Sequence, residues 1–131
     1  MTIRTLMTCT FTAFLAACAI PNQPLSAEEQ NQLAPVECHG EVQCTKMWQR
    51  AQLWIAKNSA YKIQMANDVV IETYNPREHD VNLGFSLVKE PKGGDMYEIN
   101  SRAGCSNMWG CRPHPNKARA ALHRFIRETP P

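Results

Sequence analysis

The sequence lacks the motifs that are typical of several large enzyme classes. It contains no G-x-S-x-G nucleophile motif, H-E-x-x-H zinc motif, P-loop or G-x-G-x-x-G dinucleotide loop. Glu78 with Asp80, and Asp95 with Glu98, are candidate carboxylate pairs, and His79 is a candidate base. All of them lie in or beside turn segments, where solvated polar side chains are ordinary. Without an activated nucleophile or an acid–base constellation, we predict that the protein is not an enzyme and has no cofactor.

The sequence also has little net charge and no apolar run long enough to cross a membrane. The chain has 14 Lys and Arg residues and 12 Asp and Glu residues, and the formal charge of +2 gives no general argument for a nucleic-acid partner. The apolar stretch at residues 6–17 has twelve residues. A spanning helix needs about 20, so this stretch is too short for a permanent anchor.

A secretory signal is the interpretation that fits this N-terminal stretch. Arg4 provides the positive n-region, residues 6–17 the short apolar region, and small residues precede the expected cleavage point. The run Leu15-Ala16-Ala17-Cys18 resembles the lipobox of bacterial lipoproteins. The alternatives are an uncleaved N-terminal helix and a plain secretory signal that is cut at another small residue.

The resemblance to the lipobox implies a lipid anchor on Cys18. In that family the cysteine thiol receives a diacylglyceryl group, the peptide is cut before the cysteine, and the new amino group is acylated. Several acyl chains bind a membrane far more firmly than one. Ala19, next to the cysteine, implies sorting to the outer membrane. We therefore expect a protein that is anchored in the outer membrane and faces the periplasm or the cell surface.

The chain divides into three predicted parts. Residues 1–17 form the signal peptide, residues 18–37 a flexible tether, and residues 38–129 one small folded domain. The tether is polar and rich in proline, so it cannot bury much apolar surface. Removal of the signal peptide takes away Arg4 and no acid, which lowers the formal charge from +2 to +1.

Four cysteines follow Cys18, an even number that suits disulfides in an exported protein: Cys38, Cys44, Cys105 and Cys111. They form two C-x5-C pairs and allow three connectivities. A disulfide that closes a short loop contributes about 2 kcal/mol and a long crosslink about 4 kcal/mol, so chain entropy favours the long crosslink. Because each pair lies in a glycine-containing turn, we expect local pairing, Cys38–Cys44 and Cys105–Cys111. Zinc is the alternative, because His39 and His114 lie close to the cysteines, although structural zinc sites usually have C-x2-4-C spacing.

Apolar periodicity predicts six elements in the order α-β-β-β-β-α. A helix over residues 45–58 carries a stripe with Trp48 and Trp54, which we expect to pack in the core rather than to form a ligand platform. Alternating or β-branched residues predict four strands, and a second stripe predicts a last helix: 61–65, 69–74, 81–88, 96–101 and 116–128. The predicted fold class is α+β, with a four-stranded antiparallel sheet, an N-terminal and a C-terminal helix on one face, and two disulfides.

The folded part resembles a group of small bacterial lipoproteins. The resemblance covers residues 38–126 and rests on the α-β-β-β-β-α layout, on Trp48 and Trp54, and on the segment 105–111. Some members of this group have a layout that is similar to half of a TATA-binding-protein-like fold. The resemblance implies a fold, but no activity and no catalytic residue.

Two surface features are candidate binding sites. The segment between Cys105 and Cys111 places Met108 beside Trp109, and a rigid tryptophan is a good interface anchor unless it folds back onto the sheet edge. The last helix has a basic face that would either be solvated or meet anionic lipid headgroups or an acidic partner: Lys117, Arg119, Arg124 and Arg127, with Arg112 upstream.

These observations favour a non-catalytic envelope protein that binds another envelope protein through the face of its sheet or through the Trp109 segment. Inhibition of a hydrolase is a specific case. The alternative is a small periplasmic enzyme or ligand carrier that uses the open face of the sheet. An exposed acidic and aromatic cleft would favour the alternative, and a flat face with an exposed Trp109 would favour the binding protein.

Overall fold

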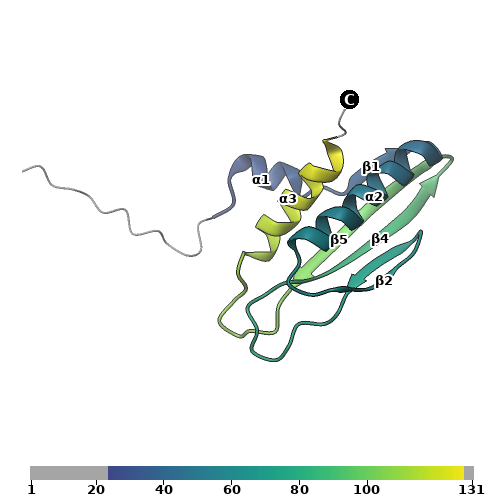
Figure 1. Cartoon of the computed structure of the whole chain (residues 1–131). Coiled ribbons are helices and arrows are strands. Elements are labelled where there is room, and N and C mark those ends of the chain that lie inside the picture. Colours follow the sequence, from purple (N-terminus) through teal and green to yellow (C-terminus); the bar gives the residue numbers. More distant parts are fainter. Residues whose placement is uncertain (1–23, 129–131) are drawn as a thin grey trace, which may run out of the picture.

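The computed structural model describes residues 24–128 of the chain, and Figure 1 shows their arrangement. The elements run in this order: α1 (Ala27–Gln32), β1 (Val36–His39), α2 (Gly40–Asn58), β2 (Ile63–Ala66), β3 (Val70–Thr73), β4 (Gly84–Gly93), β5 (Met96–Gly104) and α3 (Pro115–Arg127). The five strands form one antiparallel sheet in the order β1-β5-β4-β3-β2. The α+β class and the antiparallel sheet are therefore confirmed.

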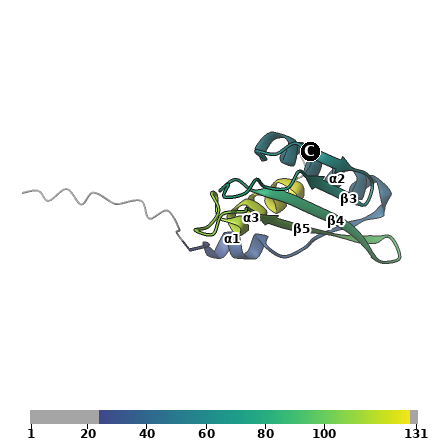
Figure 2. The same cartoon turned by 90° about the horizontal axis from the view of Figure 1, so that it is seen from below.

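Helices α2 and α3 pack on one face of the sheet, and the core lies between the two layers (Figures 1 and 2). Successive side chains of a strand point to opposite faces, so every second residue of the central strands reaches this core. Ile71, Leu87 and Ile99 on β3, β4 and β5 are fully buried as a result. They meet the apolar stripes of the helices, which include Ile55 on α2 and Leu122 on α3.

The tryptophan stripe of α2 belongs to the core, as the sequence predicts. Trp48 is 6% exposed, and its indole Nε1 donates a hydrogen bond to the Asn67 carbonyl at 2.7 Å. Trp54 is half-buried and meets Phe85 edge to face, with 5.6 Å between the ring centroids. Large aromatic side chains at helical spacing are primarily a burial signal, and here they fix α2 on the sheet.

The sheet has five strands rather than the four that the sequence predicts. The additional strand is β1, in which Val36 lies opposite Ile99 and Cys38 lies opposite Tyr97 of β5. Val36 and Cys38 are fully buried. Four residues are too few for a clear alternating pattern, and β1 forms because β5 provides its partner strand and the core accepts its two inward side chains.

The described part of the predicted tether is also folded. Helix α1 begins with a capping box, in which the Glu29 amide donates to Ser26 Oγ at 3.1 Å and the Ser26 amide donates to Glu29 Oε2 at 2.8 Å. The helix packs against α3 (Figure 1). The polar composition predicts a flexible segment, but capping and docking on α3 stabilise a short helix there, and the fold extends before residue 38.

Helix α2 begins at Gly40 rather than at Thr45, and its N-cap is His39. The first cysteine pair therefore does not form a turn before the helix. Cys38 lies in β1 and Cys44 in the second turn of α2, so this disulfide joins a strand to a helix. The expected end of the helix at Asn58 is confirmed.

The opposite face of the sheet carries mostly polar residues that are exposed or half-buried. Ser86 on β4 lies opposite Arg102 on β5, and Val88 lies opposite Asn100. Glu72 on β3 lies opposite Ser86 and continues the same row. This alternation of an apolar inner face and a polar outer face is typical of an antiparallel sheet with one solvated side.

Candidate functional site

The segment closed by the Cys105–Cys111 disulfide, here called the display loop, carries the most exposed large apolar side chains of the described residues. Met108 is 82% exposed and Trp109 is 87% exposed. The sequence leaves open whether Trp109 is exposed or folds back onto the sheet edge, and the structure has it exposed. The disulfide joins the two ends of the loop, with 5.6 Å between the cysteine Cα atoms.

Hydrogen bonds hold the display loop in one conformation. The Trp109 amide donates to Asn107 Oδ1 at 2.9 Å, and the Gly110 amide donates to the Asn107 carbonyl at 3.2 Å. Asn107 Nδ2 in turn donates to the His79 carbonyl at 2.6 Å, and the His79 amide donates to the Ser106 carbonyl at 3.2 Å. These bonds join the display loop to the neighbouring 77–81 loop, so the backbone that carries the exposed tryptophan is held in place.

The expected local pairing is confirmed, because the structure joins Cys38 to Cys44 and Cys105 to Cys111. The four cysteines that the zinc alternative requires are thus joined to each other. In the part of the chain that the structure describes, no group of three or more His, Cys, Asp or Glu side chains is arranged to hold a metal ion.

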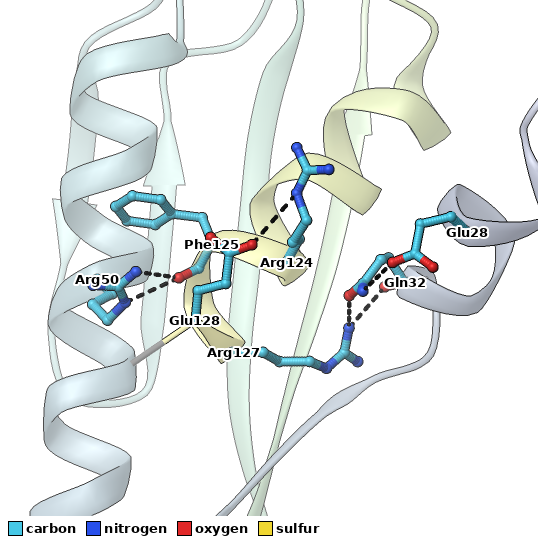
Figure 3. Close-up of polar contacts among 7 residues, drawn as sticks. All are labelled: Glu28, Gln32, Arg50, Arg124, Phe125, Arg127 and Glu128. Atoms are coloured by element: carbon cyan, nitrogen blue, oxygen red, sulfur yellow. Dashed lines mark hydrogen bonds and ion pairs between the residues drawn. The ribbon is translucent and has the colours of Figure 1, made fainter. Parts of the chain in front are cut away.

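The basic residues that the sequence predicts on one face of α3 lie in different environments in the structure. Lys117 and Arg124 line a small hollow of about 50 Å³ against α1, where Glu28 and Glu29 lie on the other side. Arg124 Nε also lies 3.8 Å from Glu128 Oε1, as Figure 3 shows. Lys117 and Arg124 thus lie near acidic residues of the same chain, which weakens the case for a lipid or partner contact through this part of the helix.

Arg127 and Arg50 have structural roles around the C-terminal half of α3 (Figure 3). Arg127 donates to Gln32 Oε1 at 2.6 Å and to the Ala34 carbonyl at 2.6 Å, which fixes the chain between α1 and β1. Arg50 of α2 donates to the Phe125 carbonyl at 2.9 and 2.6 Å, and its guanidinium carbon lies 4.3 Å from the centre of the Phe125 ring. Arg112 is exposed directly after the display loop.

Arg119 points away from this acidic surface. Its Nε donates to Ser101 Oγ at 3.3 Å, and one terminal nitrogen donates to Asn116 Oδ1 at 3.2 Å. Neither of these two partners is charged. Of the basic residues that the sequence singles out, Arg119 is the one that the fold places beside the sheet.

Behind Arg119 lies a buried polar network that the sequence does not reveal. His123 Nε2 lies 2.6 Å from Ser101 Oγ, and His123 Nδ1 lies 2.8 Å from the Gln32 carbonyl and 3.0 Å from the Ala34 carbonyl. Carbonyl oxygens only accept, so Nδ1 carries the proton and Nε2 accepts the hydrogen bond of the Ser101 hydroxyl. Burial, together with the positive charges of nearby arginines, lowers the pKa of His123 to about 4.

A serine that donates to a neutral imidazole resembles the nucleophile and base of a hydrolase, but this pair is enclosed. Ser101 is 5% exposed and His123 is 1% exposed, and Arg119 also binds the serine oxygen. A nucleophile must reach its substrate, so the geometry fits a structural role that connects α3, β5 and the segment before β1. The signal in the sequence is the i, i+3 spacing of Ala120 and His123, which are both buried.

The candidate carboxylates are engaged in local contacts. Asp80 accepts a hydrogen bond from the Tyr61 hydroxyl at 2.5 Å, and this bond lowers the pKa of the Asp80 carboxyl. Glu98 accepts from Asn100 Nδ2 at 2.8 Å and lies 3.2 Å from Lys92 Nζ, and the Asn100 bond lowers its pKa most. Both acids are thus ionised at neutral pH, which does not suit a general acid.

The contact between His79 and Glu78 is exposed to solvent. His79 Nε2 lies 3.4 Å from Glu78 Oε1, with the two side chains 77% and 87% exposed. Asp95 touches the fold through its main chain, where its carbonyl accepts from the Gly40 amide at 2.9 Å. Glu78 and His79 thus contact each other only at the solvent-exposed surface, so the geometry adds no support for an enzyme.

A shallow groove crosses the polar face of the sheet. It consists of two hollows of about 450 and 790 Å³ that share Ser86, Arg102 and Ala103. The first hollow reaches Tyr74 beside the display loop, and the second reaches Arg119 of α3. Arg102 lies where the two hollows meet, and Glu72 and Tyr74 line the first hollow and Glu90 the second, so the groove is mixed in charge rather than acidic.

Cys18, the expected site of lipidation, lies outside the described residues. Within residues 24–128, no helix is long and apolar enough to cross a membrane. No protein-family model, curated protein or solved structure matches this chain.

Proposed function

We propose that the protein is a non-catalytic, lipid-anchored component of the bacterial cell envelope that binds another envelope protein through the display loop. The observation that carries this proposal is the exposure of Trp109 and Met108 on a loop that is closed by a disulfide. Rigid aromatic side chains dominate the energetics of many protein interfaces, because they bury much area at a small cost in conformational entropy. A single exposed apolar residue is ordinary, but Met108 and Trp109 are adjacent and both exposed, and contiguous apolar surface of this kind is typical of an interaction site.

The proposed anchor is the acylated Cys18, and the proposed location is the outer membrane. The lipobox-like run and Ala19 support this part of the proposal. Incorporation of radiolabelled palmitate by the wild-type protein, and its loss in Cys18→Ala, would support the anchor. A wild-type protein that takes up no label would contradict it.

Inhibition of a hydrolase is a specific form of the proposal. A short crosslinked loop with a projecting side chain can enter an active-site cleft with little loss of conformational freedom on binding. In that case the partner is an enzyme, and the display loop blocks its substrate site. An assay of the captured partner, with and without this protein, distinguishes inhibition from simple attachment.

The experiment that tests the proposal is site-specific photocrosslinking in intact cells. A photoreactive phenylalanine analogue at position 108 should give a discrete adduct with one envelope protein. The matched control is the same analogue at position 53, because Leu53 is also an exposed apolar residue, at 45%, but lies on α2. The proposal fails if position 108 gives no adduct, or if both positions give the same adducts.

A further inference from the structure

The edge of β5 is only half covered. β1 pairs with Met96–Ile99, and in the described structure no other strand pairs with this side of the remaining residues 100–104. Apart from β4, which pairs with the other side of β5, no described segment gives residues 100–104 a backbone hydrogen bond. An uncovered strand edge presents unpaired amide and carbonyl groups in a row, which is a template for an additional strand.

The larger hollow of the groove lies along this uncovered half of β5. Its lining includes four consecutive residues of β5, from Asn100 to Ala103, together with Asn116 and Arg119 of α3. The hollow has a volume of about 790 Å³, which exceeds what a single small anion fills. An extended segment in this hollow could therefore contact side chains of α3 and the unpaired backbone groups of β5.

The charges in this hollow are predominantly positive near β5. Arg102 is exposed, and its side chain makes no hydrogen bond or ion pair with residues 24–128. Arg119 has only the neutral partners Ser101 and Asn116. Glu90 also lines the hollow, but it pairs with Glu98, four residues along β5 from Arg102. Lys92 Nζ lies 3.4 Å from Glu90 and 3.2 Å from Glu98, so one lysine is shared by these two carboxylates.

We infer that the groove binds an extended acidic segment of a partner protein, which lies along the free half of β5 and places carboxylates on Arg102 and Arg119. Strand addition gives main-chain hydrogen bonds, and alternate side chains of the added segment give specificity. Guanidinium groups without an acidic partner are well suited to carboxylates, which they bind in a planar, bidentate way. Glu72 lies in the other hollow, so the acidic residues of the partner belong over β5 rather than over β3.

This inference rests on the proposed role as a binding protein, but it uses the larger hollow, whose lining contains no residue of the display loop. The two ideas can therefore fail separately. A groove that binds no acidic segment leaves an adduct at position 108 unaffected, and a display loop without a partner leaves peptide binding to the groove unaffected.

The test uses the full-length protein, purified in a non-ionic detergent, and three fluorescein-labelled peptides of twelve residues. Threonine alternates with glutamate in the first peptide, with glutamine in the second and with lysine in the third. We expect the glutamate peptide to bind at least about tenfold more tightly than the glutamine peptide, and the lysine peptide to bind most weakly. Hydrogen exchange should slow at residues 100–104 when the glutamate peptide is bound.

Substitutions of the two arginines test whether the preference for the glutamate peptide arises from this hollow. Arg102→Gln, alone and together with Arg119→Gln, should remove the preference for the glutamate peptide. Arg77→Gln is the matched control, because Arg77 is an exposed arginine on the 77–81 loop, and it should keep the preference. The inference is overturned if the glutamate and glutamine peptides bind equally, or if the double variant keeps the preference. Binding that free glutamate abolishes at equal carboxylate concentration would indicate a simple anion site and would also overturn it.

Discussion

The Cys38–Cys44 disulfide joins β1 to α2 inside the core, whereas the Cys105–Cys111 disulfide closes the display loop at the surface. Both bridges span the same sequence separation of 6. Cys38 is fully buried and Cys44 is 2% exposed, while the second bridge encloses Trp109, which is 87% exposed. The same C-x5-C spacing thus serves the stability of the fold in one place and the presentation of a side chain in the other.

The two tryptophans Trp48 and Trp109 show the same contrast. Trp48 packs between α2 and the sheet, and its indole nitrogen has a hydrogen-bond partner. Trp109 has its amide bonded to Asn107, but its ring lies in solvent. Experiments can therefore distinguish the core from the display loop. Substitutions in the core should alter stability, and substitutions in the display loop should alter binding.

The largest expected effect is the loss of the core disulfide. The chain-entropy model gives both bridges the same contribution of about 2 kcal/mol, because they close loops of equal length. Cys38→Ala with Cys44→Ala also removes two buried sulfurs, so we expect a total loss of about 3–4 kcal/mol. Cys105→Ala with Cys111→Ala should cost about 2 kcal/mol. Urea unfolding of the two double variants measures both values.

Partner capture provides the second readout of the same variants. Cys105→Ala with Cys111→Ala opens the display loop. This variant should give a lower crosslinking yield at position 108 even though it is still folded in the absence of urea. Opening the core bridge should lower the yield only to the extent that the protein unfolds. Equal destabilisation by the two double variants would contradict the division into a core bridge and a display bridge.

The next effect is a dependence of stability on pH that arises from His123. Its pKa in the folded protein is about 4, below the unperturbed value of 6.5. As the pH falls below about 6.5, the unfolded chain takes up a proton at this position, and the folded protein does so only near pH 4. His123 should therefore reduce the free energy of unfolding progressively over this window, by about 3 kcal/mol in total.

A His123→Gln variant isolates this contribution. Carboxylates titrate in part of the same range, so the comparison is between the pH slopes of the wild type and the variant at pH 7, 5.5 and 4. The variant should lose the additional slope of the wild type, and hydrogen exchange should show that the α1 segment is the part that loosens. Identical slopes would mean that His123 is not held neutral by burial.

The elements with strong local patterns could be predicted from the sequence. The stripes of α2 and α3 give their faces, and the alternating strands β2 to β5 give the antiparallel sheet. β1 could not be predicted, because its four residues depend on a partner strand more than fifty residues away in the chain. The same is true of His123, whose environment is formed by Ser101 and the segment before β1.

The candidate site could be predicted only in part. The sequence singles out Trp109 and Met108, but their exposure depends on how the 77–81 loop holds Asn107. Arg102 was not singled out, because a lone arginine on a strand has no sequence signal of its own. Its interest arises from the register with Ser86 and from the uncovered edge beside it, which are properties of the assembled sheet.

The central claim is that Trp109 serves binding and not folding, and the most direct test measures both properties of Trp109→Ala. We predict a change in unfolding free energy below about 0.5 kcal/mol, as for surface positions. Affinity for the captured partner should fall roughly thirtyfold, which corresponds to about 2 kcal/mol. Trp48→Ala is the control and should cost about 3–5 kcal/mol of stability. A Trp109→Ala variant that is destabilised by a similar amount, and that loses its partner only in proportion to unfolding, would contradict the account.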